Sequence, residues 1–160
     1  MSVYSNPKFY SGVQLLKKRR LAKDGQTWQA DQFGRITDSG VVKARSAATA
    51  INLQFAETQA VATSSSKVKV YDIPAGGTKF VIGVTNAGSD TKALVGYIGG
   101  NYGLAVNSCV CTLSTGNDST EILHVEDVIS NVSSNRLNDT SDIPGYAIVS
   151  VIEAKRVEQT

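Results

Sequence analysis

Apolar and polar positions alternate most clearly in the second half of the chain. The segments Lys67–Ile73 (KVKVYDI) and Lys79–Thr85 (KFVIGVT) predict strands. Between them, Pro74-Ala75-Gly76-Gly77 predicts a turn. Tyr146–Ala154 (YAIVSVIEA) is almost continuously apolar and β-branched, which is typical of a strand covered on both faces.

Three further segments of this half carry weaker patterns. Ala93–Ile98 (ALVGYI) and Leu104–Leu113 predict two more strands, the second a long one. Residues 119–130 fit two structures. Leu123, Val125 and Ile129 follow strict alternation, whereas Asp118 with Glu121 resembles a helix capping box and Ile122, Val125 and Ile129 recur at helical spacing.

The first half is less regular. Residues 1–12 are polar, contain Pro7 and end in a Ser-Gly turn signal, so we expect an extended N-terminal arm. Asp24-Gly25 predicts a hairpin, and Asp38-Ser39-Gly40 predicts another turn. Residues 46–62 also fit helix or strand, and we favour an extended structure there.

These elements predict a mostly β protein. Turns recur every 8–12 residues, no fixed-period repeat is apparent, and no strand–helix–strand rhythm occurs. With 160 residues, 41% of them hydrophobic, the chain can bury a core without disulfides or metal. We expect a jelly-roll or β-barrel/sandwich domain over residues 13–160, preceded by the arm at residues 1–12.

Charge is unevenly distributed. Six basic residues precede the first acidic residue, Asp24, although the net charge is only +2. Tyr and Phe anchor many protein interfaces, and a basic strand attracts acidic surfaces. We therefore predict that the N-terminal region binds a partner; the alternative is an edge strand whose lysines prevent aggregation. The candidate partner-binding residues are Tyr4, Phe9, Tyr10, Lys17, Lys18, Arg19 and Arg20.

Catalytic and cofactor motifs are missing from the sequence. The single histidine, His124, has no nucleophile elbow to serve. Cys109 and Cys111 lack a second pair of zinc ligands and are predicted to be buried thiols in a core strand. The glycine cluster from Gly96 to Gly103 has no Lys and no following helix, so it predicts a hairpin turn. We expect no enzyme activity, no cofactor and no metal.

Two segments resemble phage proteins. Residues 79–113 resemble a segment of head proteins of tailed bacteriophages: a strand ending in Gly83, a Gly88-Ser89-Asp90 loop, a strand carrying Tyr97, and Ala105-Val106. Residues 24–42 are similar to the entry strands of capsid decoration (cement) proteins. The resemblance implies a β-barrel or jelly-roll body on the outer capsid surface, often with an N-terminal arm, and it implies no catalytic residues and no cofactor.

Together these features define a functional expectation. The chain is expected to be a virion structural protein, made in the host cytoplasm, that binds the major capsid protein outside the capsid and stabilises contacts between coat subunits. Self-association, as a trimer or between neighbours, is also expected; a small-molecule substrate, a membrane or a nucleic-acid partner is not. The alternative is a phage tail or fibre component or another β-sandwich adhesion module.

Overall fold

The computed structural model describes residues 6–12, 15–22, 26–46, 48, 50–62, 67–73, 77–87, 89–107, 110–116, 120–129 and 143–152. The protein is mostly β, which confirms the predicted fold class. In chain order the described elements are β1 (Lys8–Ser11), β2 (Leu16–Leu21), β3 (Gln26–Trp28), β4 (Phe33–Thr37), β5 (Gly40–Lys43), β6 (Leu53–Phe55), β7 (Gln59–Ala62), β8 (Lys67–Asp72), β9 (Lys79–Asn86), β10 (Ser89–Asp90), the 3₁₀ helix η1 (Val95–Tyr97), β11 (Asn101–Asn107), β12 (Val110–Ser114), β13 (Leu123–Ile129) and β14 (Tyr146–Val151).

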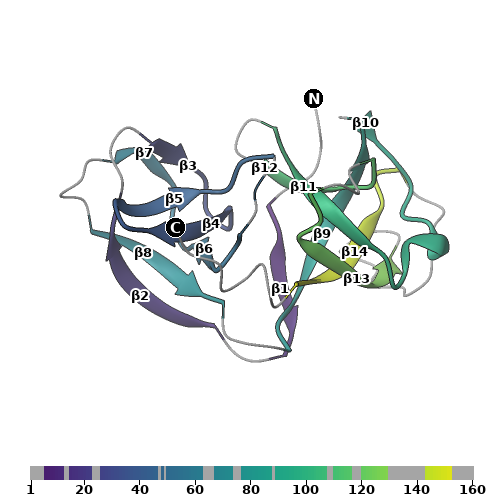
Figure 1. Cartoon of the computed structure of the whole chain (residues 1–160), viewed down its shortest axis with the longest axis horizontal. Helices are drawn as coiled ribbons and strands as arrows, with labels where there is room; N and C mark the ends of the chain where they lie inside the picture. The colour runs from purple at the N-terminus through teal and green to yellow at the C-terminus, as the bar shows by residue number, and fades with distance from the viewer. Residues whose placement is uncertain are drawn as a thin grey trace.

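Two main sheets lie side by side along the long axis of the molecule (Figure 1). The first has the order β2-β8-β6-β4-β5, and an isolated parallel bridge between Ala22 and Val41 joins its two outer strands. We call this sheet the N-terminal barrel. A small β3–β7 sheet accompanies it, from which the Trp28 ring stacks on Phe55 at 4.2 Å.

The second sheet closes on itself. Its order β9-β12-β11-β13-β14 returns to β9, because β9 pairs with both β14 and β12. We call this ring the C-terminal barrel. The β9–β12 pair is parallel, and the other pairs of the ring are antiparallel.

One hydrophobic cluster joins the two barrels. It contains Phe33, Ala44, Ile51 and Ile73 from the N-terminal half together with buried residues of β9, β11, β12, β13 and β14. Phe33 and Phe80 meet edge to face at 5.1 Å. The two sheets therefore bury apolar surface against each other, and burial of apolar surface is the main favourable contribution to folding.

Several predicted elements are confirmed. The strands at Lys67–Ile73, Lys79–Thr85 and Tyr146–Ala154 correspond to β8, β9 and β14. The turn at residues 38–40 joins β4 and β5 as a hairpin, because Thr37 pairs with Gly40. The ambiguous residues 46–62 contain β6 and β7, and the ambiguous residues 119–130 contain β13, so the strand alternatives are correct there.

Other predicted elements are wrong. Ala93–Ile98 contains η1 instead of a strand. The long strand at Leu104–Leu113 is two antiparallel strands, β11 and β12. Asp24-Gly25 lies outside the described residues, but the strands on either side of it do not form a hairpin, because β2 pairs with β8 while β3 pairs with β7. β2 and β3 instead pair with strands that are remote in sequence, and local patterning contains no information about them.

The predicted N-terminal arm needs a correction as well. Of residues 1–12, the structure describes 6–12, and these belong to the body of the protein. β1 pairs with β9, and Asn6 and Pro7 are buried. The side-chain oxygen of Asn6 accepts a hydrogen bond of 2.8 Å from the backbone N–H of Cys111. Such a buried hydrogen bond ties this segment to the core instead of leaving it free.

Candidate protein-binding surface

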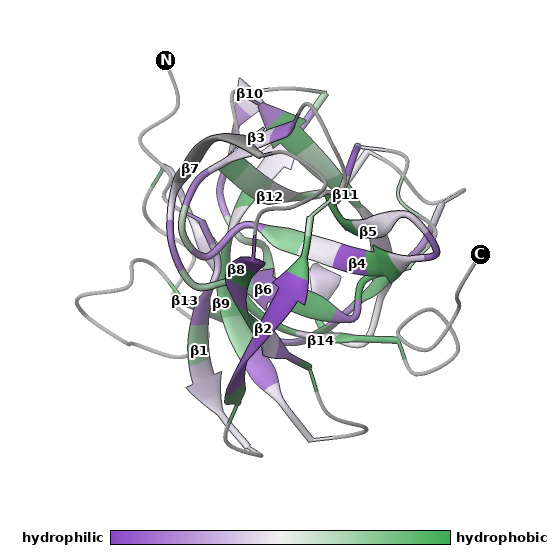
Figure 2. Ribbon diagram, turned by 90° about the vertical axis from the view of Figure 1, so that its left-hand side faces the viewer, coloured by the Kyte–Doolittle hydropathy of each residue, from purple (hydrophilic) through white to green (hydrophobic). Residues whose placement is uncertain are grey.

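Four of the predicted partner-binding residues lie on β2. This strand carries the basic run Lys17–Arg20, and Figure 2 colours most of it as hydrophilic. β2 pairs with β8 on one side and stands at the edge of its sheet. Successive side chains of a strand point to opposite faces, so the basic run divides into two pairs with different surroundings.

Lys18 and Arg20 face the same side as the buried Val70 and Val68 opposite them. Both form ion pairs with Asp72 of β8, at 3.1 Å and 2.6 Å. Partial burial raises the pKa of Asp72, but hydrogen bonds from Arg20 and Lys18 and their charges outweigh burial and hold this pKa below its ordinary value. This pair therefore stabilises the barrel and is only partly available to a partner.

Lys17 and Arg19 face the opposite, outer side of the β2–β8 ladder. The Lys17 ammonium lies 5.8 Å from the centre of the Tyr71 ring, a cation–π contact. Arg19 is exposed and makes no ion pair with any residue that the structure describes. Lys69 and Lys67 lie opposite Arg19 and Leu21 on β8. Lys69 forms an ion pair with Glu57 at 3.2 Å, and the other cations make the outer face of this ladder basic.

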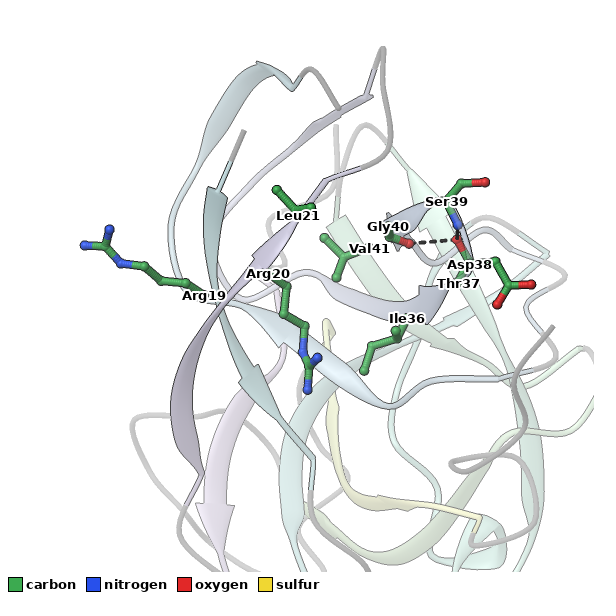
Figure 3. Close-up of a pocket in the computed structure, with 9 residues that line it drawn as sticks. All are labelled: Arg19, Arg20, Leu21, Ile36, Thr37, Asp38, Ser39, Gly40 and Val41. Carbon is green, nitrogen blue, oxygen red and sulfur yellow. Dashed lines mark hydrogen bonds between the residues drawn. The ribbon is translucent and has the colours of Figure 1, made fainter. Parts of the chain in front are cut away.

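A groove runs along the free side of β2. It has a volume of about 330 Å³ and lies between the second half of β2 and the β4–β5 hairpin. Figure 3 shows Arg20 and Ile36 directed into the space between these strands, while Arg19 points away. The groove thus has apolar residues, Ile36 and Val41, between a basic side on β2 and a polar side at the β4–β5 turn that includes Asp38.

The aromatic candidates lie elsewhere. Phe9 and Tyr10 are on β1, which belongs to the other sheet, so the structure does not bring them together with the basic run in one sheet. Tyr10 packs against a cluster of Val81, Ile129 and Ile148, and it therefore contributes to the fold. Phe9 remains 45% exposed. Tyr4 lies outside the described residues.

Sequence patterning missed an exposed apolar patch at η1. Leu94, Val95 and Ile98 are 46%, 52% and 37% exposed, and we call these three residues the η1 patch. Gly145 allows the chain before η1 to lie close to the start of β14, because a Cβ at this position would lie 2.3 Å from the backbone nitrogen of Ala93. A strand was predicted here since the same apolar residues suit a buried strand.

The candidate catalytic and metal-binding residues are dispersed. His124 lies on β13, where its Nδ1 is 2.7 Å from Oδ1 of Asn101, while the neighbouring Ser150 hydroxyl donates to Glu126 at 3.0 Å. Cys111 is a buried free thiol on β12, as predicted, and Cys109 lies outside the described residues. Among the residues with described positions, no three His, Cys, Asp or Glu side chains gather as metal ligands.

Within the described segments, no helix is long and apolar enough to cross a bilayer.

Comparisons with known proteins provide no relative. No protein-family model, curated protein or solved structure matches the chain.

Proposed function

We propose that this chain is a non-enzymatic virion protein that decorates the outside of a bacteriophage capsid and stabilises contacts between coat subunits. One observation carries the proposal. The basic β2–β8 face and the apolar η1 patch lie towards opposite ends of the long axis of the molecule (Figure 1). A protein with two exposed surfaces at opposite ends can contact two neighbouring subunits at once.

The chemistry of the two surfaces suits a repetitive protein lattice. A basic face attracts acidic coat surfaces from a distance, and exposed apolar side chains supply buried area after contact. Many copies on one particle turn weak individual contacts into firm attachment, because each second contact is intramolecular. The resemblance of residues 24–42 and 79–113 to phage capsid proteins supports the same class, although Tyr97 lies in a 3₁₀ helix and not in a strand.

The decisive experiment is attachment to undecorated heads. Purified protein should bind such heads saturably, reach a copy number comparable to that of the coat protein, and give ordered density on the outer surface in cryo-electron microscopy. Failure to bind heads would contradict the proposal. A copy number far below that of the coat protein, with density on the tail, would instead support the tail or fibre component.

A further inference from the structure

The two barrels repeat one strand order. Taking the five strands of each in chain order, the N-terminal barrel uses β2, β4, β5, β6 and β8, and the C-terminal barrel uses β9, β11, β12, β13 and β14. In both, the first strand pairs with the fifth, the fifth with the fourth, the fourth with the second, and the second with the third. In both, the first and third strands meet in parallel and close the ring.

This parallel seam is short in each barrel. β12 pairs with β9 only at Val84 and Thr85, near the end of β9. The single bridge of the other barrel, Ala22 to Val41, likewise comes directly after β2. In each barrel, the third strand therefore pairs only with the end of the first strand. The beginning of the first strand has no partner in the third strand on that edge.

In the C-terminal barrel, β1 occupies that place. Phe80 and Val81 pair with β14 on one edge of β9 and with β1 on the other. The backbone N–H of Val84 donates a hydrogen bond to the carbonyl of Gly145, and the Val84 carbonyl accepts one from Thr91. These bonds place the β14 and β10 segments on one edge of β9, and the other edge is left to β1 and β12. β1 thus runs antiparallel to β9 in the gap that β12 does not reach, and Asn6 bonds to Cys111 of β12 beside it.

The equivalent place in the N-terminal barrel has no strand in the part of the chain that the structure describes. The equivalent place is the free edge of β2 at Leu16–Arg20. Near Arg20, this edge opens into the groove beside the β4–β5 hairpin (Figure 3). Leu16 and Leu21, at the two ends of β2, are 66% and 53% exposed. An unpaired edge of this kind is a template for an added strand.

We infer that an extended segment of another polypeptide, in which acidic and apolar residues alternate, adds to the free edge of β2 antiparallel to it, as β1 adds to β9. Main-chain hydrogen bonds supply affinity in strand addition, and alternate side chains supply specificity. The apolar side chains of the segment would face the side of the ladder on which Ile36 lies, and its carboxylates would lie beside Lys17 and Arg19 on the outer face. Lys18 and Arg20 are already paired with Asp72, so the outer pair selects the charge.

This inference deepens the proposed function, and it rests on that function in one respect: a coat subunit is taken as the natural source of the added strand. Its test uses a peptide and no phage heads, so strand addition and capsid decoration can fail separately. The probe is a short fluorescent peptide that alternates Val and Glu, added to the full-length protein and followed by fluorescence anisotropy. We expect saturable binding, together with slower hydrogen exchange of the backbone amides of β2.

Three control peptides separate strand addition from simple charge attraction. A peptide alternating Val and Lys should not bind. Two acidic peptides are N-methylated at alternate residues, one at the odd and one at the even positions, so each keeps every charge but loses the backbone N–H donors of one edge. The peptide that loses the donors facing β2 should bind at least about tenfold more weakly. Equal binding of both methylated forms and the unmodified peptide would overturn the inference.

Protein variants locate the site. Lys17→Ser with Arg19→Ser should weaken peptide binding by roughly threefold to tenfold, as expected for the loss of two surface charges. The matched control, Arg45→Ser with Lys92→Ser, removes the same charge at exposed positions outside β2 and should leave binding unchanged. Equal weakening by both pairs, or equally tight binding of oligothymidylate, would show general attraction of polyanions and would overturn the inference.

Discussion

Asp72 shows at the residue scale how the basic run is held. Because its pKa is lowered in the folded protein, its charge contributes stability above its ordinary pKa of 3.8. That contribution is lost as the pH falls through the lower, folded pKa. We expect Asp72→Asn to lower the free energy of unfolding by about 1 kcal/mol at pH 7, since the ion pairs are partly exposed.

The pH dependence distinguishes this effect from a packing defect. In urea unfolding, the difference between the parent protein and Asp72→Asn should shrink as the pH is lowered below about 4, where the parent loses the same charge. Asp38→Asn, at the exposed turn of the β4–β5 hairpin, serves as the control for removal of a surface carboxylate. A difference that is unchanged by acid would refute the electrostatic explanation.

The sequence predicts part of this site at residue level. Alternation along a strand already separates Lys17 and Arg19 from Lys18 and Arg20. Nothing in the local sequence indicates Asp72, which β8 brings next to β2 from a remote part of the chain. The fate of Tyr10 was unpredictable for the same reason, because its burial depends on contacts with Val81, Ile129 and Ile148.

At the scale of elements, β1 is part of the fold. Deleting residues 1–12 removes the strand from the seam of β9 and leaves the backbone N–H of Cys111 without Asn6. A buried donor without a partner costs about 1–3 kcal/mol. We therefore expect the deletion to lower the melting temperature, measured by circular dichroism, and loss of head binding by this variant would not by itself identify an attachment arm.

A milder variant isolates the contribution of Asn6. Asn6→Ala keeps β1 but removes the side-chain oxygen that accepts from Cys111. It should reproduce a substantial part of the destabilisation, whereas Lys8→Ala, at an exposed position of β1, should change the melting temperature less. Equal melting temperatures for the deletion and the parent protein would show that β1 is dispensable.

β14 is the element whose loss should be most severe. It pairs with β13 on one side and β9 on the other, and Ala147, Ile148 and Val149 are buried. Fully burying Ile or Val contributes roughly 1.5–3 kcal/mol each, against a total stability of about 5–15 kcal/mol for a typical domain. Truncation after Gly145 should abolish cooperative unfolding; a soluble truncated protein with a sharp thermal transition would contradict this.

Strong apolar patterns predicted the buried strands of the fold, and weaker ones failed for identifiable reasons. The first residues of β8 alternate between Lys and Val, and β9 and β14 are rich in β-branched residues, so local pattern and tertiary position agree. β11 ends at Asn107 and β12 begins at Val110, and the sequence between them, Ser-Cys, lacks the glycine that usually signals a tight hairpin. η1 exposes residues that are apolar enough for a strand, so hydrophobicity alone gives the wrong structure there.

At the scale of the whole molecule, the repeated barrel has a faint trace in the sequence. Residues 33–41 read FGRITDSGV and residues 102–110 read YGLAVNSCV, which share Gly, Ser and Val at the same spacing. The hairpins, however, pair Thr37 with Gly40 and Asn107 with Val110. When the two sequences are aligned by their shared residues, the second hairpin is therefore displaced by one position from the first. That shift, together with unequal connections elsewhere, hides the repeat from a search for a fixed period.

The last prediction concerns the two ends of the molecule acting together. Lys17→Ser with Arg19→Ser changes the basic end, and Leu94→Ser with Val95→Ser changes the η1 patch; all four positions are exposed, so folding should be little affected. If the protein bridges two coat subunits, each double variant should still attach to heads through its intact end. Neither should protect heads against heat, because protection requires both contacts, and the variant with all four changes should not attach.

Salt should weaken attachment of the η1 variant most, because that variant depends on the basic end and charges are screened over about 10 Å at 0.1 M. Full heat protection by either double variant, measured as the temperature at which heads release their DNA, would show that one end is sufficient and that the protein does not bridge subunits through these two surfaces.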